Sequence, residues 1–231
     1  LKGESEVASW APAVMPEPSI STMQKLQQLY AEDAFLGTRL EQALMANQVV
    51  GRNGMTANRR QGQSFGVLVD AAAAFLADAS GPSIAVLESN GWDTHANQGA
   101  SQGQLAGKFR ELDRGLARLK SGLEKTWNNT AVLVVTEFGR TAAVNGTQGT
   151  DHGTGGAALL LGGSVKGGRI QGQWPGLASG NLYQGRDLAP TTDMRSLFKT
   201  VLRDHLQLPQ VNIESELFPN SADAPFIANL V

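Results

Sequence analysis

An amphipathic helix pattern between two short apolar runs constrains the fold more than any other feature of the sequence. Apolar side chains recur every three or four residues at Leu105, Phe109, Leu112, Leu116, Leu119 and Leu123, and charged residues fill the other faces. The flanking runs, 83–88 and 130–136, have the length and apolarity of buried strands. A strand, a helix and a second strand in this order predict a parallel pair with a right-handed crossover.

The remaining patterns extend this prediction along the chain. Further helices are predicted over about 19–30, with Ser19 or Ser21 as the N-cap, over 36–44 and 64–79, and in a stretch capped by Thr191 or Thr192. A third apolar run, 157–161, predicts another strand. We find neither an internal repeat nor a boundary between domains. We therefore expect one α/β domain over 1–231, in which helices cover a mostly parallel sheet.

Composition excludes several classes of protein. The 231 residues are 41% hydrophobic and 17% charged, which is typical of a globular chain and not of a disordered one. The formal net charge of −2 gives no basic excess for a phosphate backbone, so we expect no nucleic-acid partner. No apolar stretch approaches about 18 residues, so we expect no membrane span. The absence of cysteine rules out disulfides, thiolate metal sites and a cysteine nucleophile.

Acidic and histidine side chains gather in the loops at the ends of the predicted strands. They are Asp93 and His95 after the first strand, Glu137 at the end of the second, and Asp151 and His152 before the third. Ligands of open α/β sheets bind beyond the carboxyl ends of the strands, so these loops are expected to converge. Their nitrogen and oxygen donors suit Zn²⁺ or another divalent cation. The alternative is that each aspartate caps a turn beside a surface histidine.

Arg140 is the candidate catalytic residue that is not a metal ligand. It follows a Glu-Phe-Gly turn, and its guanidinium could hold an anionic substrate in a bidentate manner. The structural alternative is an ion pair with Glu137 or Asp151. Neither a Gly-x-Ser-x-Gly elbow nor a nucleotide-binding glycine motif accompanies these residues, which disfavours a serine hydrolase of that type and a nucleotide-binding protein.

Several runs together resemble the domain-of-unknown-function 1501 family. They are Gly-Trp-Asp-Thr-His at 91–95, Thr-Glu-Phe-Gly-Arg-Thr at 136–141, Thr-Asp-His-Gly at 150–153, and the segments 166–169 and 174–177. The likeness extends from about Trp10 to Pro209. That family is placed in the alkaline phosphatase–sulfatase superfamily. The resemblance therefore implies a three-layer α/β/α sandwich with a mostly parallel sheet, and an ancestry of bimetal hydrolases that cleave esters.

The superfamily pattern carries over to individual residues. By this resemblance, Asp93 and His95 would bind one metal, and His152 would return to it from a later loop. In the superfamily, an Asp-His-Gly motif binds the second metal. Here Glu137 occupies the position of its aspartate, and Phe138, which cannot coordinate, replaces its histidine. The resemblance thus implies one or two ions, or none.

The same resemblance implies an early strand and a nucleophile segment that have no counterpart before Trp10. We therefore expect the chain to be the C-terminal portion of a longer domain, with little esterase activity of its own. Self-association into a homo-oligomer, or a companion segment, would cover the gap in the sheet. Family members typically begin with an export signal, so a periplasmic or secreted location is expected.

Two hypotheses about function remain open at this point. The first is an exported metal-dependent hydrolase of phosphate or sulfate esters, incomplete in this chain, that acts on a small anionic ester. The second is a non-catalytic exported protein, with a binding or structural role on the same fold. Stoichiometric metal would favour the first hypothesis, and its absence would favour the second.

Overall fold

The computed structural model describes residues 9–11, 18–52 and 64–231, which form two compact units. The first unit comprises described residues of Leu1–Asn90 together with Phe109–Glu124. The second comprises Gly91–Lys108 and Lys125–Val231. The chain therefore crosses from one unit to the other three times, and one of the helices begins in the second unit and continues into the first.

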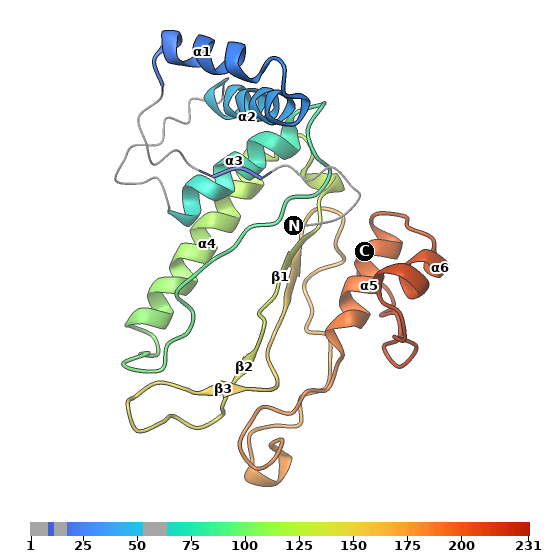
Figure 1. The fold of residues 1–231 in the computed structure, drawn as a ribbon. Coiled ribbons are helices and arrows are strands. Elements are labelled where there is room, and N and C mark those ends of the chain that lie inside the picture. Colours follow the sequence, from blue (N-terminus) through green and yellow to red (C-terminus); the bar gives the residue numbers. More distant parts are fainter. Residues whose placement is uncertain (1–8, 12–17, 53–63) are drawn as a thin grey trace. The chain divides into compact units, whose positions relative to one another are not determined.

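The first unit contains three helices from the N-terminal part of the chain, α1 (Ile20–Tyr30), α2 (Ala34–Arg52) and α3 (Phe65–Ala77). Of the two predicted caps Ser19 and Ser21, Ser19 caps α1, because its hydroxyl accepts the Thr22 N–H at 3.2 Å. Asp33 caps α2 in the same way. α2 contacts both α1 and α3, and Figure 1 shows α1 and α2 lying close together.

The fourth helix, α4 (Gln104–Gly122), confirms the strongest helical pattern of the sequence. Its part within the first unit packs against α3. A Cβ on Gly115 would come within 2.5 Å of the Phe65 ring, so glycine allows the two helices to approach closely there. Arg118 pairs with Asp70 of α3, donating from Nε to Oδ1 at 2.8 Å. The core of this unit consists of small and aliphatic side chains, among them Val69, the alanines of 71–74, Leu112, Leu119 and Leu123.

We expect Leu112→Ala to destabilise this helical unit by about 2–5 kcal/mol. Leu112 is only 8% exposed, so the substitution removes buried methyl groups and leaves a cavity that the packed helices fill only in part. Chemical denaturation followed by circular dichroism measures the loss. The matched control is Arg114→Ala on the exposed face of α4, where a change within about 0.5 kcal/mol is expected. Equal effects of the two substitutions would contradict the packing described here.

The second unit contains the strands. β1 (Val132–Val134) pairs with β4 (Leu159–Leu161), and β2 (Gly139–Arg140) pairs with β3 (His152–Gly153). Both pairs are antiparallel, with Leu133 opposite Leu160 and Arg140 opposite His152. Figure 1 shows β2 following β1 along the chain, with β3 beside it. Short 3₁₀ turns, η1 (Trp127–Asn129) and η2 (Ser179–Asn181), lie in the connections.

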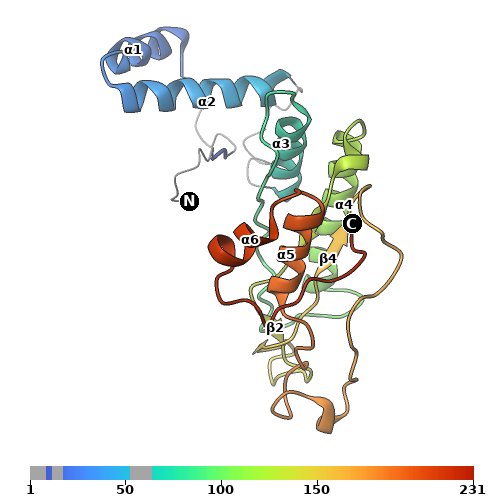
Figure 2. The ribbon, with the colours of Figure 1, turned by 90° about the vertical axis from the view of Figure 1, so that its right-hand side faces the viewer.

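The C-terminal part of this unit is built around α5 (Met194–Asp204). Asp193, rather than the predicted Thr191 or Thr192, caps this helix by accepting the Arg195 N–H at 2.8 Å. A short helix, α6 (Gln210–Asn212), leads into a π-helical turn, η3 (Ile213–Leu217), which packs on α5. Figure 2 shows α5 and α6 side by side, as does Figure 1. Lys199, at the centre of α5, is completely buried.

The prediction of a three-layer α/β/α sandwich with a mostly parallel sheet is wrong. The described residues form helices and two small two-stranded antiparallel sheets, and no parallel pair occurs among them. The predicted strands at 130–136 and 157–161 exist in shortened form, as β1 and β4, but they pair with each other in opposite directions. The predicted strand at 83–88 has no regular secondary structure and pairs with no other strand, so the expected crossover between two parallel strands does not form there.

Two physical features explain this correction. The apolar run 83–88 is not buried on both faces, since Ile84 is 61% and Val86 87% exposed, so its composition does not reflect a central strand. In addition, glycines let loops pack backbone against backbone where a sheet was expected. A side chain on Gly139 would clash with the Gly155 carbonyl, and one on Gly155 with the Leu188 carbonyl. These backbone contacts join the segment between β1 and β4 to the segment that carries Leu188.

A membrane span was not expected, and among the helices within the described ranges none has both the length and the apolarity to cross a bilayer.

Candidate functional site

Two loops of the second unit bring one aspartate and two histidines together. Asp93 and His95 lie on the loop that precedes α4, and His152 lies on β3. One donor atom from each residue can be chosen so that all three atoms lie within 4.8 Å of one another. We call Asp93, His95 and His152 the Asp-His-His cluster. The convergence that the sequence predicted for these three residues therefore occurs, although antiparallel loops and not parallel strand ends produce it.

The contacts of the cluster converge on a single carboxylate oxygen. Asp93 Oδ1 lies 3.0 Å from His95 Nε2, 2.9 Å from His152 Nε2 and 2.6 Å from Arg140 Nη2. The hydrogen bond from His152 lowers the pKa of Asp93 below its ordinary value of 3.8; desolvation opposes this effect, and the hydrogen bond from Arg140 reinforces it. Asp93 is therefore a carboxylate at neutral pH, which is the form that coordinates a metal.

Backbone pairing joins the two loops that carry the cluster. Ala96 and Gln148 form an isolated antiparallel bridge, and the Gln98 N–H donates to the Gln148 carbonyl at 2.9 Å. Side chains also join the two loops, because the buried hydroxyls of Thr94 and Thr150 both donate to Gln98 Oε1, at 2.9 and 2.8 Å. These bonds place residues on either side of His95 against residues preceding His152, which fixes the distance between the two imidazoles.

An aromatic contact orients His152. The Phe138 ring stacks on the His152 ring, with centroids 3.9 Å apart and planes 17° apart. The His95 ring is the second ring near His152, and the two ring centroids lie 5.0 Å apart. Phe138 supplies no ligand, as the sequence indicated, but its ring restricts the rotation of His152.

Arg140 forms hydrogen bonds with both loops that carry the cluster. Its guanidinium donates to the Thr150 carbonyl at 2.8 Å, to the Trp92 carbonyl at 2.9 Å and to Asp93. Its side chain is 23% exposed, the least of the charged groups at the site. The expected partners Glu137 and Asp151 are thus replaced by Asp93 and two backbone carbonyls. Arg140 places its positive charge beside the cluster, and its role toward a substrate stays a prediction.

Two of the predicted metal ligands lie outside the cluster. Glu137 is exposed on the segment that joins β1 to β2, and its carboxylate is not part of the group of three. Asp151 lies on the opposite side of the His95 ring, where Oδ1 is 3.3 Å from Nδ1. Hydrogen bonds from Asn145 and His95 hold the pKa of Asp151 below its ordinary value, although desolvation opposes them.

Asn145 is the member of the site that sequence reasoning missed. Its side-chain amide donates to Asp151 Oδ1 at 2.9 Å and to the His95 carbonyl at 3.0 Å. An Asn-Gly pair such as 145–146 is typical of a turn, but a turn signal does not reveal which distant side chain the asparagine holds. Only the antiparallel approach of the two loops brings Asn145 to His95.

The donor set fits a divalent cation. Two imidazole nitrogens and one carboxylate oxygen are a combination found at catalytic zinc sites, in which a fourth position remains open. About half of each side chain is exposed, with values of 53% for Asp93, 46% for His95 and 50% for His152. An ion at this point would therefore be reachable from solvent.

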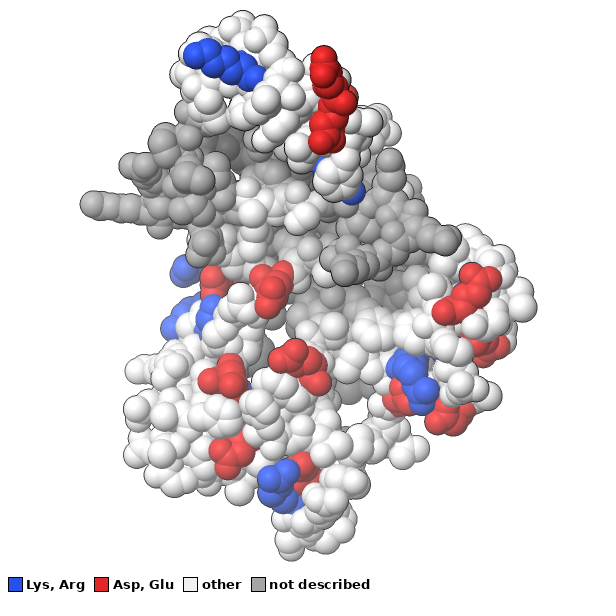
Figure 3. All heavy atoms as spheres, viewed as in Figure 1, with Lys and Arg blue, Asp and Glu red and all other residues white. Residues whose placement is uncertain are grey.

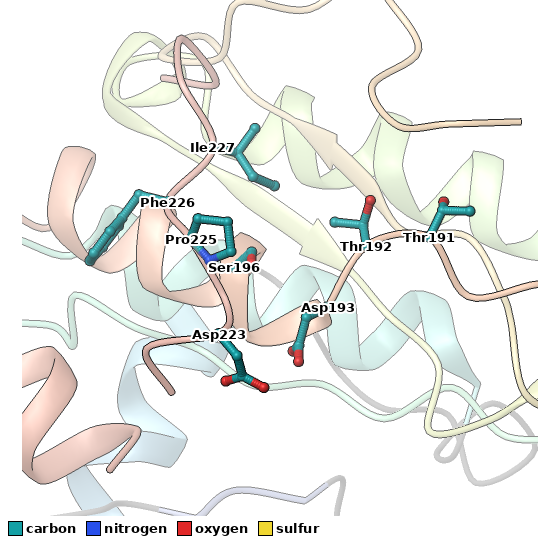
Figure 4. Close-up of a pocket in the computed structure, with 8 residues that line it drawn as sticks. All are labelled: Thr191, Thr192, Asp193, Ser196, Asp223, Pro225, Phe226 and Ile227. Carbon is teal, nitrogen blue, oxygen red and sulfur yellow. The ribbon is translucent and has the colours of Figure 1, made fainter. Parts of the chain in front are cut away.

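The two pockets described for the structure lie elsewhere. One, of about 260 Å³, lies between the first turn of α5 and the C-terminal segment, and its lining residues are labelled in Figure 4. Its two acidic side chains, Asp193 and Asp223, are both paired with Arg195. The other is formed by four residues of 210–215. On the face in Figure 3, the described acidic and basic side chains are interspersed, without a broad basic patch.

The fold and the site together define a helix-rich protein with an exposed Asp-His-His cluster held between two loops. A family model described as "Protein of unknown function (DUF1501)" matches residues 14–217, and the chain belongs to that family. The resemblance read from the sequence motifs is thereby confirmed at the level of the family. No curated protein and no solved structure matches the chain.

Proposed function

We propose that this protein is a metal-dependent hydrolase of phosphate or sulfate esters, with one divalent ion held by Asp93, His95 and His152. The observation that carries the proposal is the convergence of these three side chains beside Arg140. The metal-binding part of the proposal draws on the site and not on the fold, since the described residues contain no parallel sheet of the kind that the alkaline phosphatase–sulfatase superfamily would imply.

The residues favour one ion over two. Phe138 stacks on His152 and fills the space beside it with an apolar ring, and Glu137 is not part of the cluster. Carboxylate and imidazole ligands suit Zn²⁺, and other divalent ions such as Mn²⁺ or Fe²⁺ accept the same donors. The Nε2 atoms of the two histidines would hold the ion only after losing their protons, and Arg140 would keep Asp93 in place.

A divalent ion in this position supplies a Lewis acid that polarises an ester oxygen and lowers the pKa of bound water. The chain's own residues do the remaining work. Arg140 adds fixed positive charge next to the cluster, which favours an anionic ester over a neutral one. The hydroxyls of Thr94 and Thr150 donate to Gln98 Oε1, and the nucleophile in this proposal is water. Turnover should accordingly be slow.

The substrate class and the location follow from the resemblance as further proposals. Small phosphate or sulfate monoesters fit an open site, because an exposed cluster imposes little steric selection on the rest of the substrate. A periplasmic or secreted location agrees with the export signals typical of the family.

The exposure of the cluster favours one alternative function. A site without an enclosing cavity gives little orientation to a substrate, and orientation is a large part of enzymatic rate enhancement. The alternative is therefore an exported protein that binds a metal or a partner through this surface and catalyses nothing.

Metal content and turnover distinguish these functions. Protein purified without chelator is expected to contain about one divalent ion per chain by elemental analysis. It should hydrolyse nitrophenyl phosphate or nitrophenyl sulfate slowly, with Zn²⁺, Mn²⁺, Mg²⁺ or Ca²⁺ added in turn, and chelation should abolish the activity. Stoichiometric metal without turnover would favour the binding protein. Folded protein that takes up no ion from any of these solutions would refute the metal site.

A further inference from the structure

We propose that Asp187 is a positioning residue of the candidate metal site, because it fixes β2, which carries Arg140, relative to β3, which carries His152. Asp187 is not a metal ligand in this proposal. The consequence for metal affinity rests on the function proposed above, whereas the positioning itself can be measured in the metal-free protein.

The two segments that carry the histidines of the site are held unequally. The carbonyl of His95 accepts the Thr147 hydroxyl at 2.6 Å and the Asn145 amide, and Gly149 packs directly against it, because a Cβ there would clash with this carbonyl. His152 lies on β3 instead, which comprises two residues and pairs only with the two residues of β2. A two-stranded ribbon is marginally stable by itself, so the position of His152 needs support from outside the ribbon.

The segment 186–188 contacts both strands just beyond their paired residues. Asp187 forms an isolated antiparallel bridge with Thr141, the residue that follows β2. On the other strand, the Gly155 N–H, two residues after the end of β3, donates to the Leu188 carbonyl at 3.0 Å. The backbone of 186–188 is therefore joined to the continuation of β2 and to that of β3.

The carboxylate of Asp187 adds a side-chain link to β3. The residue is only 2% exposed, and its Oδ2 accepts the hydroxyl of Thr154, the residue that follows β3, at 2.9 Å. Arg186 balances the charge, with Nη2 donating to Oδ2 at 3.2 Å and Nε 2.8 Å from Oδ1, an ionic contact without hydrogen-bond geometry. A buried carboxylate with so few donors is costly, so Asp187 strongly favours the one arrangement in which Thr154 reaches it.

A shift of β3 against β2 would disturb the centre of the site. Arg140 Nη2 and His152 Nε2 lie 2.6 and 2.9 Å from the same oxygen, Asp93 Oδ1, so their spacing depends on the offset of the two strands. The Phe138 ring, directly before β2, stacks on the His152 ring at 3.9 Å and would lose this contact. Residues that support metal ligands from behind change metal affinity by about 10–100-fold in general.

Substitutions at Thr154 test the link without truncating the buried Asp187, where alanine would leave a cavity. Thr154 is exposed, so Thr154→Val removes the hydroxyl at little other cost to the fold. Thr154→Ser is the conservative variant, because it keeps the hydroxyl. Thr130→Val is the matched control in the same unit, since the Thr130 hydroxyl donates to the Thr126 carbonyl at 2.9 Å, outside the site.

The measurement in the metal-free protein is the nuclear Overhauser effect between the rings of Phe138 and His152. We expect this effect in the wild type, in Thr154→Ser and in Thr130→Val, and its loss in Thr154→Val. The affinity of Thr154→Val for Co²⁺, measured by visible absorption, should fall by about 10–100-fold, while serine restores it. Thr154→Val with the wild-type ring contact, or Thr154→Ser without it, would overturn the positioning role. If the ring contact responds as expected but the wild type binds no Co²⁺, the proposed function is refuted and the positioning role stands.

Discussion

Alanine in place of either His95 or His152 is expected to abolish the stoichiometric metal content of the protein. Each substitution removes one of three ligands. Losing a residue that merely supports a ligand costs about 10–100-fold in affinity, so losing the ligand itself should cost more than about 100-fold. Elemental analysis of protein purified without chelator and titration with Zn²⁺ or Co²⁺ measure the effect. Any ester hydrolysis by the wild-type protein should disappear with the metal.

His205 provides the matched control. It is the third histidine of the chain, it follows α5, and its Nδ1 lies 3.2 Å from the Ser164 hydroxyl, outside the cluster. His205→Ala should leave metal binding unchanged. Glu137→Gln should do the same, because this carboxylate is outside the group of three. If Glu137→Gln abolished metal binding and His95→Ala did not, the ion would bind at a different place.

Lys199→Met is expected to destabilise the second unit by about 3–5 kcal/mol. The Lys199 ammonium is inaccessible to solvent and donates to Glu214 Oε1 at 2.9 Å and to the carbonyls of Ser221 and Ala224 at 2.9 and 3.0 Å. Methionine fills the volume but donates nothing, so two buried carbonyls lose their partner at about 1–3 kcal/mol each, and Glu214 loses its counter-ion. Urea denaturation measures the difference.

The pH dependence of this difference identifies its ionic part. The hydrogen bonds from Lys199 and Gln210 hold the pKa of Glu214 below its ordinary value of 4.5. A depressed carboxyl pKa stabilises the folded state above the unfolded value and loses that effect as pH falls through the folded value. The gap between wild type and Lys199→Met should therefore narrow below about pH 4.5. Lys166→Met is the control, since Lys166 makes an exposed hydrogen bond to Val231, and it should change stability by at most about 0.5 kcal/mol.

Helices were predictable from the sequence because their determinants are local. The Ser19 cap and the leucine spacing of α4 act within a few residues, and the structure confirms both. Sheet pairing depends on partners far apart in the chain. The apolar runs identified β1 and β4, but composition carries no information on strand direction, and the antiparallel register of Leu133 with Leu160 was not foreseen. Exposure of Val86 likewise depends on what packs against it.

The candidate site was likewise predictable from the sequence only in part. Asp93, His95 and His152 were identified by residue type, because few side chains in the sequence offer imidazole nitrogen. The sequence could not predict that Asp151 and Glu137 lie outside the cluster. All carboxylates in these loops are equivalent candidates as ligands until the direction of each loop is known. Asn145 was missed because its role depends on a hydrogen bond to the carbonyl of His95, which is fifty residues away in the sequence, together with one to the nearby Asp151.

The close approach of Gly149 to His95 has a consequence for how sequences of this family can diverge. Any side chain at position 149 would push the two loops apart and separate the imidazole from its partners. Gly146, in the same turn, has open space where a Cβ would stand. Selection for an intact cluster should therefore purge substitutions at position 149 and tolerate them at 146, so that an alignment of relatives retaining the Asp-His-His cluster would show one glycine fixed and the other drifting.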